Sequence, residues 1–364
     1  MILARYLARR FLFNFASVSG VFVGLLLLID MVEQLRRFAD SPVGMTEAAR
    51  LAALNLPGAY YKILPLITML ATLAMFVALS RTSELVAMRS AGRHGLRLLA
   101  APVLAAAALG AVAVAVLNPI VAATSQRYDI VSDRLRGGDG SVISISREGL
   151  WLREAAPEGQ RVIRAERATG DGTQLGEVTF LIFGRETGPM RRIEADEARL
   201  EAGHWQLGNA KDWPLLAPNP ELSALAHEAL ILPSDLTQAR LRDSFGAPSS
   251  IPIWDLPAFI QRLDAAGFSA RQHRVWFQME LALPLFMAAM VMIGAGFTMR
   301  HARAGKLGKH VLAALLGGFG FFFLRNFAQV LGETGQLPIL LAAWTPPAAA
   351  ALLALAYILH REDA

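Results

Sequence analysis

Long runs of apolar residues occupy both ends of the chain, with a long polar stretch between them. A transmembrane helix needs about 20 mainly apolar residues. Six segments reach that length, namely residues 11–31, 58–79, 98–117, 276–299, 311–331 and 340–359. The pattern predicts an α-helical polytopic membrane protein, in which three transmembrane helices precede the polar stretch and three follow it.

The polar stretch has a different period. Residues 141–146 alternate between polar and apolar side chains, as a half-buried strand does. Similar short runs follow, separated by Gly, Pro, Asp and Asn: residues 150–153, 161–165, 177–183, 190–195, 198–202 and 204–207. Many short strands with regular turns are typical of an all-β sandwich or jelly roll. One helix is predicted near the end of the stretch, between Asp255 as its N-cap and Gly267.

Two features near the N-terminus need separate interpretation. Arg9 and Arg10 precede the first apolar run as in a twin-arginine signal. The run is too long for the apolar region of a signal peptide, and no small-residue cleavage site follows it, so we expect it to remain as the first span. Residues 46–56 predict a short amphipathic helix along the outer surface, which Pro57 would end.

The composition excludes several classes of soluble protein. Charged residues make up 18% of the chain and apolar residues 54%, whereas a soluble domain has about 25% charged residues. The stretch from residue 118 to residue 274 holds 18 basic and 21 acidic residues, and the rest of the chain has a net charge of +8. A nucleic-acid-binding protein would instead concentrate basic residues on its soluble part. The absence of cysteine excludes disulfides and thiolate metal sites.

Basic residues in the short loops predict the orientation in the membrane. They lie before the first span and in two alternate loops: Arg5, Arg9, Arg10, Arg81, Arg89, Arg93, Arg97, Arg300, Arg303, Lys306 and Lys309. We therefore expect both termini in the cytoplasm and the inserted domain on the opposite side. The predicted domains are residues 1–117 with spans 1–3, residues 118–274 with the β domain and its short helix, and residues 275–364 with spans 4–6.

Motifs of catalytic chemistry are missing from the sequence. Gly305-Lys306 and Gly308-Lys309 lack the glycine that a P-loop carries five residues earlier. The seven histidines are scattered without a His-Glu-x-x-His pair, and no Gly-x-Ser-x-Gly motif occurs. We therefore expect a non-enzymatic protein without cofactor or metal, whose function is transport, anchoring or scaffolding.

The loop between the second and third spans predicts a short helix at about residues 81–92. Thr82 or Ser83 can cap it, and Gly92 can end it. Glu84 suits the positive N-terminal end of a helix. The helix also carries three apolar side chains: Leu85, Val86 and Met88. Two interpretations remain, namely a turn that lies on the lipid headgroups and a coupling helix that inserts into a cytoplasmic motor subunit.

This loop and four other parts of the chain resemble the LptF/LptG permeases of lipopolysaccharide export. Residues 83–92, with the sequence SELVAMRSAG, look like the coupling helix of that family. The other similar segments are residues 30–37 in the first span, 149–153 at the start of the periplasmic domain, 282–285 in the fourth span, and 332–338 followed by 342–347. The last segment is closer to the LptG branch than to the LptF branch.

The resemblance implies a subunit of an ATP-driven exporter in the inner membrane of a Gram-negative bacterium, with a periplasmic β-jellyroll domain. Its partners would be an LptF-like permease, an LptB-like ATPase dimer and an LptC-like single-span protein. The complex would extract lipopolysaccharide from the outer leaflet and pass it to the periplasmic bridge, while the separate ATPase hydrolyses ATP. In the coupling helix, Glu84 would make the polar contact to the ATPase, and the apolar side chains would fill its groove. The implied coupling residues are Glu84, Leu85, Val86, Met88 and Arg89.

Ionisable residues in membrane spans are costly and usually functional, so those near the spans are candidates for lipid contact. The candidates, with two aromatics that could line an acyl-chain cavity, are Asp30, Arg36, Arg37, Lys62, Arg325, Phe319 and Phe322. The cations could receive lipid A phosphates, which arginine binds bidentately. The alternatives are snorkelling to headgroups and a lipid-facing phenylalanine surface.

Two acidic residues need their own explanation. Asp30 stands where the family often has a basic residue, and an acid does not attract phosphate. We expect Asp30 to pair with Arg325 or with a residue of the partner subunit. Glu280 lies one turn into the fourth span, and we expect it to be solvated at the interface.

Three other classes remain as alternatives to an LptG-type permease. The LptF-type paralogue shares the architecture. A membrane-anchored sensor or scaffold needs fewer spans, and a receptor would carry a cytoplasmic output domain. A membrane-embedded enzyme would need a catalytic set that the sequence lacks. Co-purification distinguishes these classes, because an exporter subunit should bring down a P-loop ATPase and a similar six-span chain.

Overall fold

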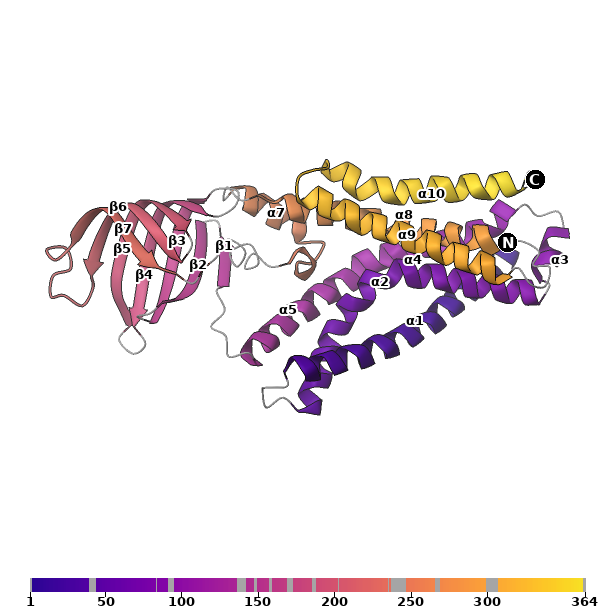
Figure 1. Ribbon diagram of the computed structural model, residues 1–364, viewed down its shortest axis with the longest axis horizontal. Coiled ribbons are helices and arrows are strands. Elements are labelled where there is room, and N and C mark those ends of the chain that lie inside the picture. Colours follow the sequence, from indigo (N-terminus) through magenta and orange to yellow (C-terminus); the bar gives the residue numbers. More distant parts are fainter. Residues whose placement is uncertain are drawn as a thin grey trace. The chain divides into compact units, whose positions relative to one another are not determined.

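The computed structural model contains a helical unit and a β unit (Figure 1). It describes residues 2–38, 44–82, 84–90, 95–135, 142–146, 149–156, 159–168, 173–184, 188–201, 203–234, 236, 247–265, 269–298 and 307–362. The helical unit is Met1–Asp129, Pro252–Trp254 and Arg271–Ala364, and the β unit is Ile130–Ile251 with Asp255–Ala270. Each unit is described by itself below.

The helical unit has six helices that are long and apolar enough to cross a membrane, which confirms the predicted polytopic fold. They are α1 (Ile2–Arg37), α2 (Met45–Arg81), α4 (Gly95–Val112) with its continuation, α8 (Arg271–Thr298), α9 (Leu307–Glu333) and α10 (Ile339–Glu362). Helix α4 continues through the π-helical turn η1 (Ala113–Leu117) into α5 (Asn118–Leu135). The helix therefore runs past the predicted domain boundary at residue 118, and the helical unit includes it as far as Asp129.

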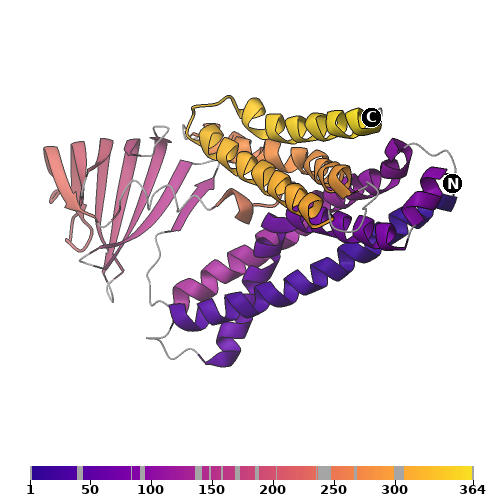
Figure 2. The same ribbon diagram turned by 45° about the vertical axis from the view of Figure 1, so that its right-hand side comes forward.

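Helices α2 and α8 form the interior of the helical unit. In each of these two helices, 67% of the most apolar 18-residue stretch is buried. The same share is 0% in α1 and 17% in α9. Helices α9 and α10 lie beside α8, as two views of the ribbon show (Figures 1 and 2). The outer helices thus present apolar side chains that this chain does not cover.

The prediction of a separate helix over residues 46–56 is wrong. These residues form the first turns of α2, which continues through Pro57 and Pro65. A proline removes one backbone donor, but packing against neighbouring helices allows a membrane helix to continue through it. Leu51 and Ala52, on the first turns, are fully buried, so the N-terminal part of α2 belongs to the bundle.

The turn between α9 and α10 contains the motif at residues 332–338. Arg271 Nε donates to the Gly332 carbonyl (2.6 Å), and Arg271 Nη2 donates to the Leu337 carbonyl (2.5 Å). Gly335 has a φ of +90°, a conformation that favours glycine. The motif therefore builds a tight turn in which the first residue of α8 binds two carbonyls.

A glycine determines how closely α4 approaches α8. A Cβ atom at Gly110 would lie 2.7 Å from Pro284 Cα, a backbone atom that cannot move aside alone. We expect Gly110→Val to destabilise the helical unit by about 1–3 kcal/mol, the usual effect of overpacking. Thermal unfolding of the purified chain measures this. Gly20→Val is the matched control, because nothing lies within 4 Å of that position, and equal unfolding midpoints would contradict the expectation.

The β unit contains one antiparallel sheet in which the strand order follows the sequence. Its strands are β1 (Val142–Ser146), β2 (Gly149–Ala156), β3 (Gly159–Ala168), β4 (Gln174–Gly184), β5 (Gly188–Glu201), β6 (His204–Pro214) and β7 (Leu225–Pro233). The inserted all-β domain is confirmed. Its described strands are joined as a meander, without the crossover connections of the two Greek keys in a jelly roll.

Two details of the strand prediction differ from the structure. The runs at residues 190–195 and 198–202 were predicted as two strands, but residues 190–195 and 198–201 belong to one strand, β5, while residue 202 lies outside the described residues. Strand β7 was not predicted, because its sequence LAHEALILP does not alternate strictly. The predicted helix is present as α7 (Leu256–Ala265), directly after Asp255, while Gly267 lies outside the described residues.

One face of the sheet encloses a core around Phe180 and Trp205, whose rings meet edge-on at 6.0 Å. Arg161 is fully buried and donates to Glu154 (2.6 Å) and to the Pro233 carbonyl at the end of β7 (2.9 Å). Ser234 donates to the other oxygen of Glu154 (2.7 Å). Because these bonds join β2 and β3 to the end of β7, the sheet curls upon itself.

Candidate functional site

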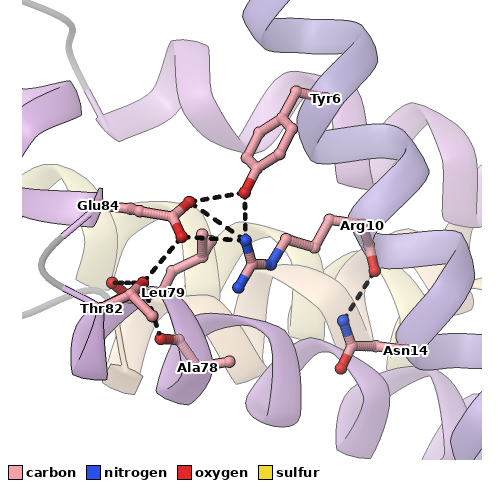
Figure 3. A network of polar contacts seen from close by, with 7 residues as sticks. All are labelled: Tyr6, Arg10, Asn14, Ala78, Leu79, Thr82 and Glu84. Atoms are coloured by element: carbon pink, nitrogen blue, oxygen red, sulfur yellow. Dashed lines mark hydrogen bonds and ion pairs between the residues drawn. The ribbon is translucent and has the colours of Figure 1, made fainter.

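The first candidate site surrounds Glu84, the first residue of helix α3 (Glu84–Ser90). Its carboxylate accepts hydrogen bonds from Tyr6 Oη (2.6 Å), Arg10 Nη1 (3.1 Å) and Thr82 Oγ1 (2.9 Å). Figure 3 shows these side chains converging from α1, from the end of α2 and from α3. The carboxylate thus ties the short helix to the N-terminal part of α1, far away in the sequence.

Further contacts hold the donors of Glu84 in place, both on α1 and at the end of α2. The Arg10 guanidinium lies 5.6 Å from the centre of the Tyr6 ring and also donates to the Tyr6 hydroxyl. The backbone N–H of Thr82 donates to the Ala78 carbonyl (3.1 Å), which fixes Thr82 at the end of α2 while its hydroxyl donates to Glu84. Asn14 Nδ2 bonds to the Arg10 carbonyl (2.8 Å) one turn further along α1 (Figure 3).

The Glu84 carboxylate is charged at neutral pH. The hydrogen bond from Tyr6 lowers its pKa most, and the bonds from Thr82 and Arg10 lower it further. One third of the side chain is exposed. An ionised carboxylate at the start of a helix, reachable from outside, can receive a further cation or donor from a partner.

The other predicted coupling residues lie in different environments. Leu85 is buried against the bundle, and Met88 is partly buried against the same cluster. In this conformation Leu85 anchors α3 to its own chain instead of offering its side chain to a partner's groove. The side chains of Val86 and Arg89 lie outside the described residues.

The residues predicted to contact lipid fall into two groups. The first group lies around the C-terminal part of α1, where Asp30 Oδ1 accepts from Asn55 (2.9 Å) and Gln34 (3.4 Å). Arg37 donates to the Tyr128 hydroxyl (3.0 Å). The three cations predicted for this group, Arg36, Arg37 and Lys62, are all exposed.

Arg325 belongs to the second group, so the predicted pairing of Asp30 with Arg325 is wrong within the described part of the chain. The carboxylate of Asp30 bonds to the two amides instead. The Arg325 guanidinium lies 5.6 Å from the centre of the Phe286 ring. Phe322 is partly buried near these helices, while Phe319 is exposed.

A buried carboxylate on α8 forms the centre of the second group. Glu280 is only 1% exposed, so the prediction that it is solvated is wrong. Its Oε2 atom accepts from the Tyr61 hydroxyl and from Asn118 Nδ2 (3.2 Å).

Several functional candidates were missed from the sequence. Glu280 is an acidic residue inside an apolar run, and this position alone could have identified it as a functional candidate. Tyr6, Arg10, Tyr61 and Asn118 carry no comparable signal, because their partners lie 74 or more residues away. Only the fold brings them to the two carboxylates.

Together, the fold and the two sites define a multi-pass membrane protein with an inserted β domain and a short helix that is charge-linked to the first span. The family model described as "Lipopolysaccharide export system permease LptF/LptG" matches residues 5–360. The chain belongs to this family.

Two relatives show how widely the similarity extends. The chain is 23% identical to the lipopolysaccharide export system permease protein LptG of Haemophilus influenzae over 350 residues, which are 94% of each chain. It is 22% identical to the protein of the same name from Escherichia coli K12 over 368 residues, covering 100% of this chain and 99% of that one. The resemblance stated from the sequence motifs is confirmed.

Proposed function

We propose that the chain is the LptG-type permease subunit of an ATP-driven lipopolysaccharide exporter in the inner membrane. The family match over residues 5–360 carries this proposal. The LptG type rests on the names of the two relatives and on the motif at residues 332–338. Both termini face the cytoplasm, and the β unit faces the periplasm, in accord with the basic residues of the alternate loops.

The proposed complex contains an LptF-like permease, a dimer of an LptB-like ATPase and an LptC-like single-span protein. The apolar faces that the chain leaves uncovered on α1 and α9 suit the partner permease and the lipid. The chain has three functional parts, namely spans 1–3, the inserted domain and spans 4–6. The inserted domain begins at residue 118 by the sequence pattern and at Ile130 by the compact units of the structure. ATP is hydrolysed by the separate ATPase, and this subunit supplies the path for lipopolysaccharide.

Helix α3 is the proposed coupling helix. Glu84 provides a charged group that is one-third exposed, and Met88 provides apolar surface beside it. Leu85 anchors the helix to the bundle, and Val86 and Arg89 complete the set that contacts the ATPase. A movement of the ATPase would then reach α1 through the Tyr6–Arg10–Glu84 contacts.

Co-purification tests this function. The full chain, expressed in its own membrane, should bring down a P-loop ATPase and a second six-span chain. Recovery of neither would favour the anchored scaffold and contradict the exporter. Reconstitution with an LptF-type or an LptG-type partner then distinguishes the two branches, because an LptG-type subunit should support export only with the former.

The lipid contacts give a more local prediction. Arg36→Glu together with Arg37→Glu should weaken photocrosslinking of lipopolysaccharide to the bundle severalfold, because two phosphate-binding cations become repulsive. Arg50→Glu is the control, since it changes an exposed arginine on the neighbouring helix α2. Unchanged crosslinking in the double variant would favour snorkelling of Arg36 and Arg37 to the headgroups.

A further inference from the structure

Trp254 supplies a hydrogen bond that the third span cannot make by itself. Pro119 has no amide N–H, and its ring crowds the carbonyl four residues earlier, that of Ala115. The helix widens here into the π-helical turn η1, where the Asn118 amide bonds to the Ala113 carbonyl, five residues earlier. The Ala115 carbonyl thus lacks the donor that an α-helix would give it, and Trp254 Nε1 donates to it instead (3.2 Å).

The short segment that carries this tryptophan is fixed to the same turn. The Ile253 amide donates to Asn118 Oδ1 (2.9 Å), and Ile253 is buried. Pro252–Trp254 belongs to the helical unit, so both bonds lie within that unit. Trp254 remains 69% exposed, although its one side-chain donor is already bonded. The segment therefore presents an aromatic ring on the surface at one level of the third span.

This level coincides with the end of the apolar part of the span. The helix Gly95–Ser132 has 38 residues, about 57 Å at 1.5 Å per residue. The hydrocarbon core of a bilayer is about 30 Å thick and needs about 20 residues, so part of this helix leaves the core. No residue between Arg97 and Arg127 is charged, and the apolar run ends at Leu117. The boundary of the core therefore falls close to η1.

The helix surface around the turn is apolar and uncovered. Val112 and Val116 are more than half exposed, and Ile120 is nearly half exposed. Hydrocarbon suits these side chains, but it offers no donor to the Ala115 carbonyl. An indole meets both conditions, because its N–H bonds the carbonyl and its ring suits the boundary between acyl chains and headgroups.

We propose that the Trp254 ring lies in the interfacial region of the bilayer and anchors the Pro252–Trp254 segment there. The partner of this surface is lipid, at the level where acyl chains meet headgroups. The proposal goes beyond the exporter function and does not depend on it, because any membrane phospholipid can fill this role.

Spin labels on single cysteines test the level of the turn while Trp254 stays in place, and the chain has no native cysteine to interfere. Three exposed positions receive the label: Leu104→Cys in the apolar run, Val116→Cys at the turn and Arg127→Cys beyond it. The full chain is placed in phosphatidylcholine nanodiscs without lipopolysaccharide. Access of oxygen should exceed access of a water-soluble nickel chelate severalfold at residue 104. The order should be reversed at residue 127, and residue 116 should lie between the two.

Two results at residue 116 would overturn the proposal. Access equal to that at residue 127 would place the turn in water. Poor access of both reagents would show that protein covers the surface, and the partner would then not be lipid.

Brominated phosphatidylcholines test Trp254 itself. The chain has six tryptophans, so the fluorescence that is lost in Trp254→Phe isolates the emission of this one. Bromines near the carbonyl end of the acyl chains should quench this emission severalfold more than bromines near the methyl end or iodide in the water. Trp151→Phe is the matched control, because Trp151 is a partly exposed tryptophan on β2. Iodide and not the lipids should quench the emission that this control removes.

Three results of the quenching experiment would overturn the proposal. Quenching of Trp254 by iodide alone would place its ring in water, and stronger quenching by the methyl-end bromines would place it deep in the core. Quenching by none of the three would show that protein covers the ring. If Trp254→Phe fails to fold, the spin labels still decide the matter, because each labelled variant keeps Trp254.

Discussion

Purified exporter complex that carries Glu84→Ala should still hydrolyse ATP but should export lipopolysaccharide at least about tenfold more slowly. The charged carboxylate accepts hydrogen bonds from Tyr6, Arg10 and Thr82. A hydrogen bond to a charged group contributes about 1.5–3 kcal/mol, which corresponds to about a 10- to 150-fold change in the population of the linked state. ATPase rate and lipopolysaccharide release, measured on one preparation, separate hydrolysis from transport.

Glu33→Ala is the control, because it removes an exposed glutamate from α1 at a distance in sequence from the cluster. It should export at the unmodified rate. Normal export by the Glu84→Ala complex would refute the coupling role of α3. Loss of both hydrolysis and export would show that the helix is needed for assembly and not for coupling.

Exchanging the charges of Arg10 and Glu84 separates the contact of Glu84 within its own chain from its proposed contact with the ATPase. Arg10→Glu combined with Glu84→Arg rebuilds the ion pair between α1 and α3 with the opposite polarity. It should not restore export, because the proposed contact with the ATPase needs a negative charge at residue 84. Full recovery would mean that the carboxylate acts only within its own chain.

Local sequence patterns predicted the elements well, because each depends on neighbours along the chain. Apolar runs marked all six spans, and the period of two marked most strands. The length of α2 was missed because the local sequence predicts that a helix ends at Pro57. In the structure α2 continues through Pro57, and Leu51 and Ala52 before it are buried in the bundle. Strand β7 was missed because its register is set by β6 and not by its own alternation.

The sites were harder to predict, because their partners come from distant segments. The helix around Glu84 could be predicted from its capping residues, but its bonds to Tyr6 and Arg10 require the path of α1. Glu280 appeared close to the membrane interface because the fourth span was taken to begin at residue 276. Helix α8 begins at Arg271, and Tyr61 and Asn118 close over the carboxylate from other helices.

Helix α1 connects the two ends of the proposed mechanism. Tyr6 and Arg10 hold the coupling helix, while Asp30 and Arg37 bond to Asn55 and Tyr128 of α2 and α5. The helix has 36 residues, which is about 54 Å of continuous helix at 1.5 Å per residue. A force on α3 would therefore reach the proposed lipid-binding end through α1 alone. The rest of the chain buries little of the apolar surface of α1.

Glu280→Leu should destabilise the helical unit by about 1–3 kcal/mol for each buried donor that it leaves unpaired, the usual cost of an unsatisfied buried polar group. The variant removes the acceptor of the Tyr61 and Asn118 bonds, and both donors are buried. The midpoint of thermal unfolding in detergent or nanodiscs measures the loss.

Two variants separate the charge of Glu280 from its hydrogen bonds. Glu280→Gln keeps one acceptor oxygen, which can serve both donors because the Tyr61 and Asn118 bonds end on the same oxygen, and it should lose less stability than Glu280→Leu. Glu280→Leu combined with Tyr61→Phe removes the acceptor together with one of its two donors and should recover part of the loss, because one buried donor stays unpaired instead of two. An unchanged midpoint in Glu280→Leu alone would show that the two donors find other partners, and the buried carboxylate would then have no part in holding the bundle together.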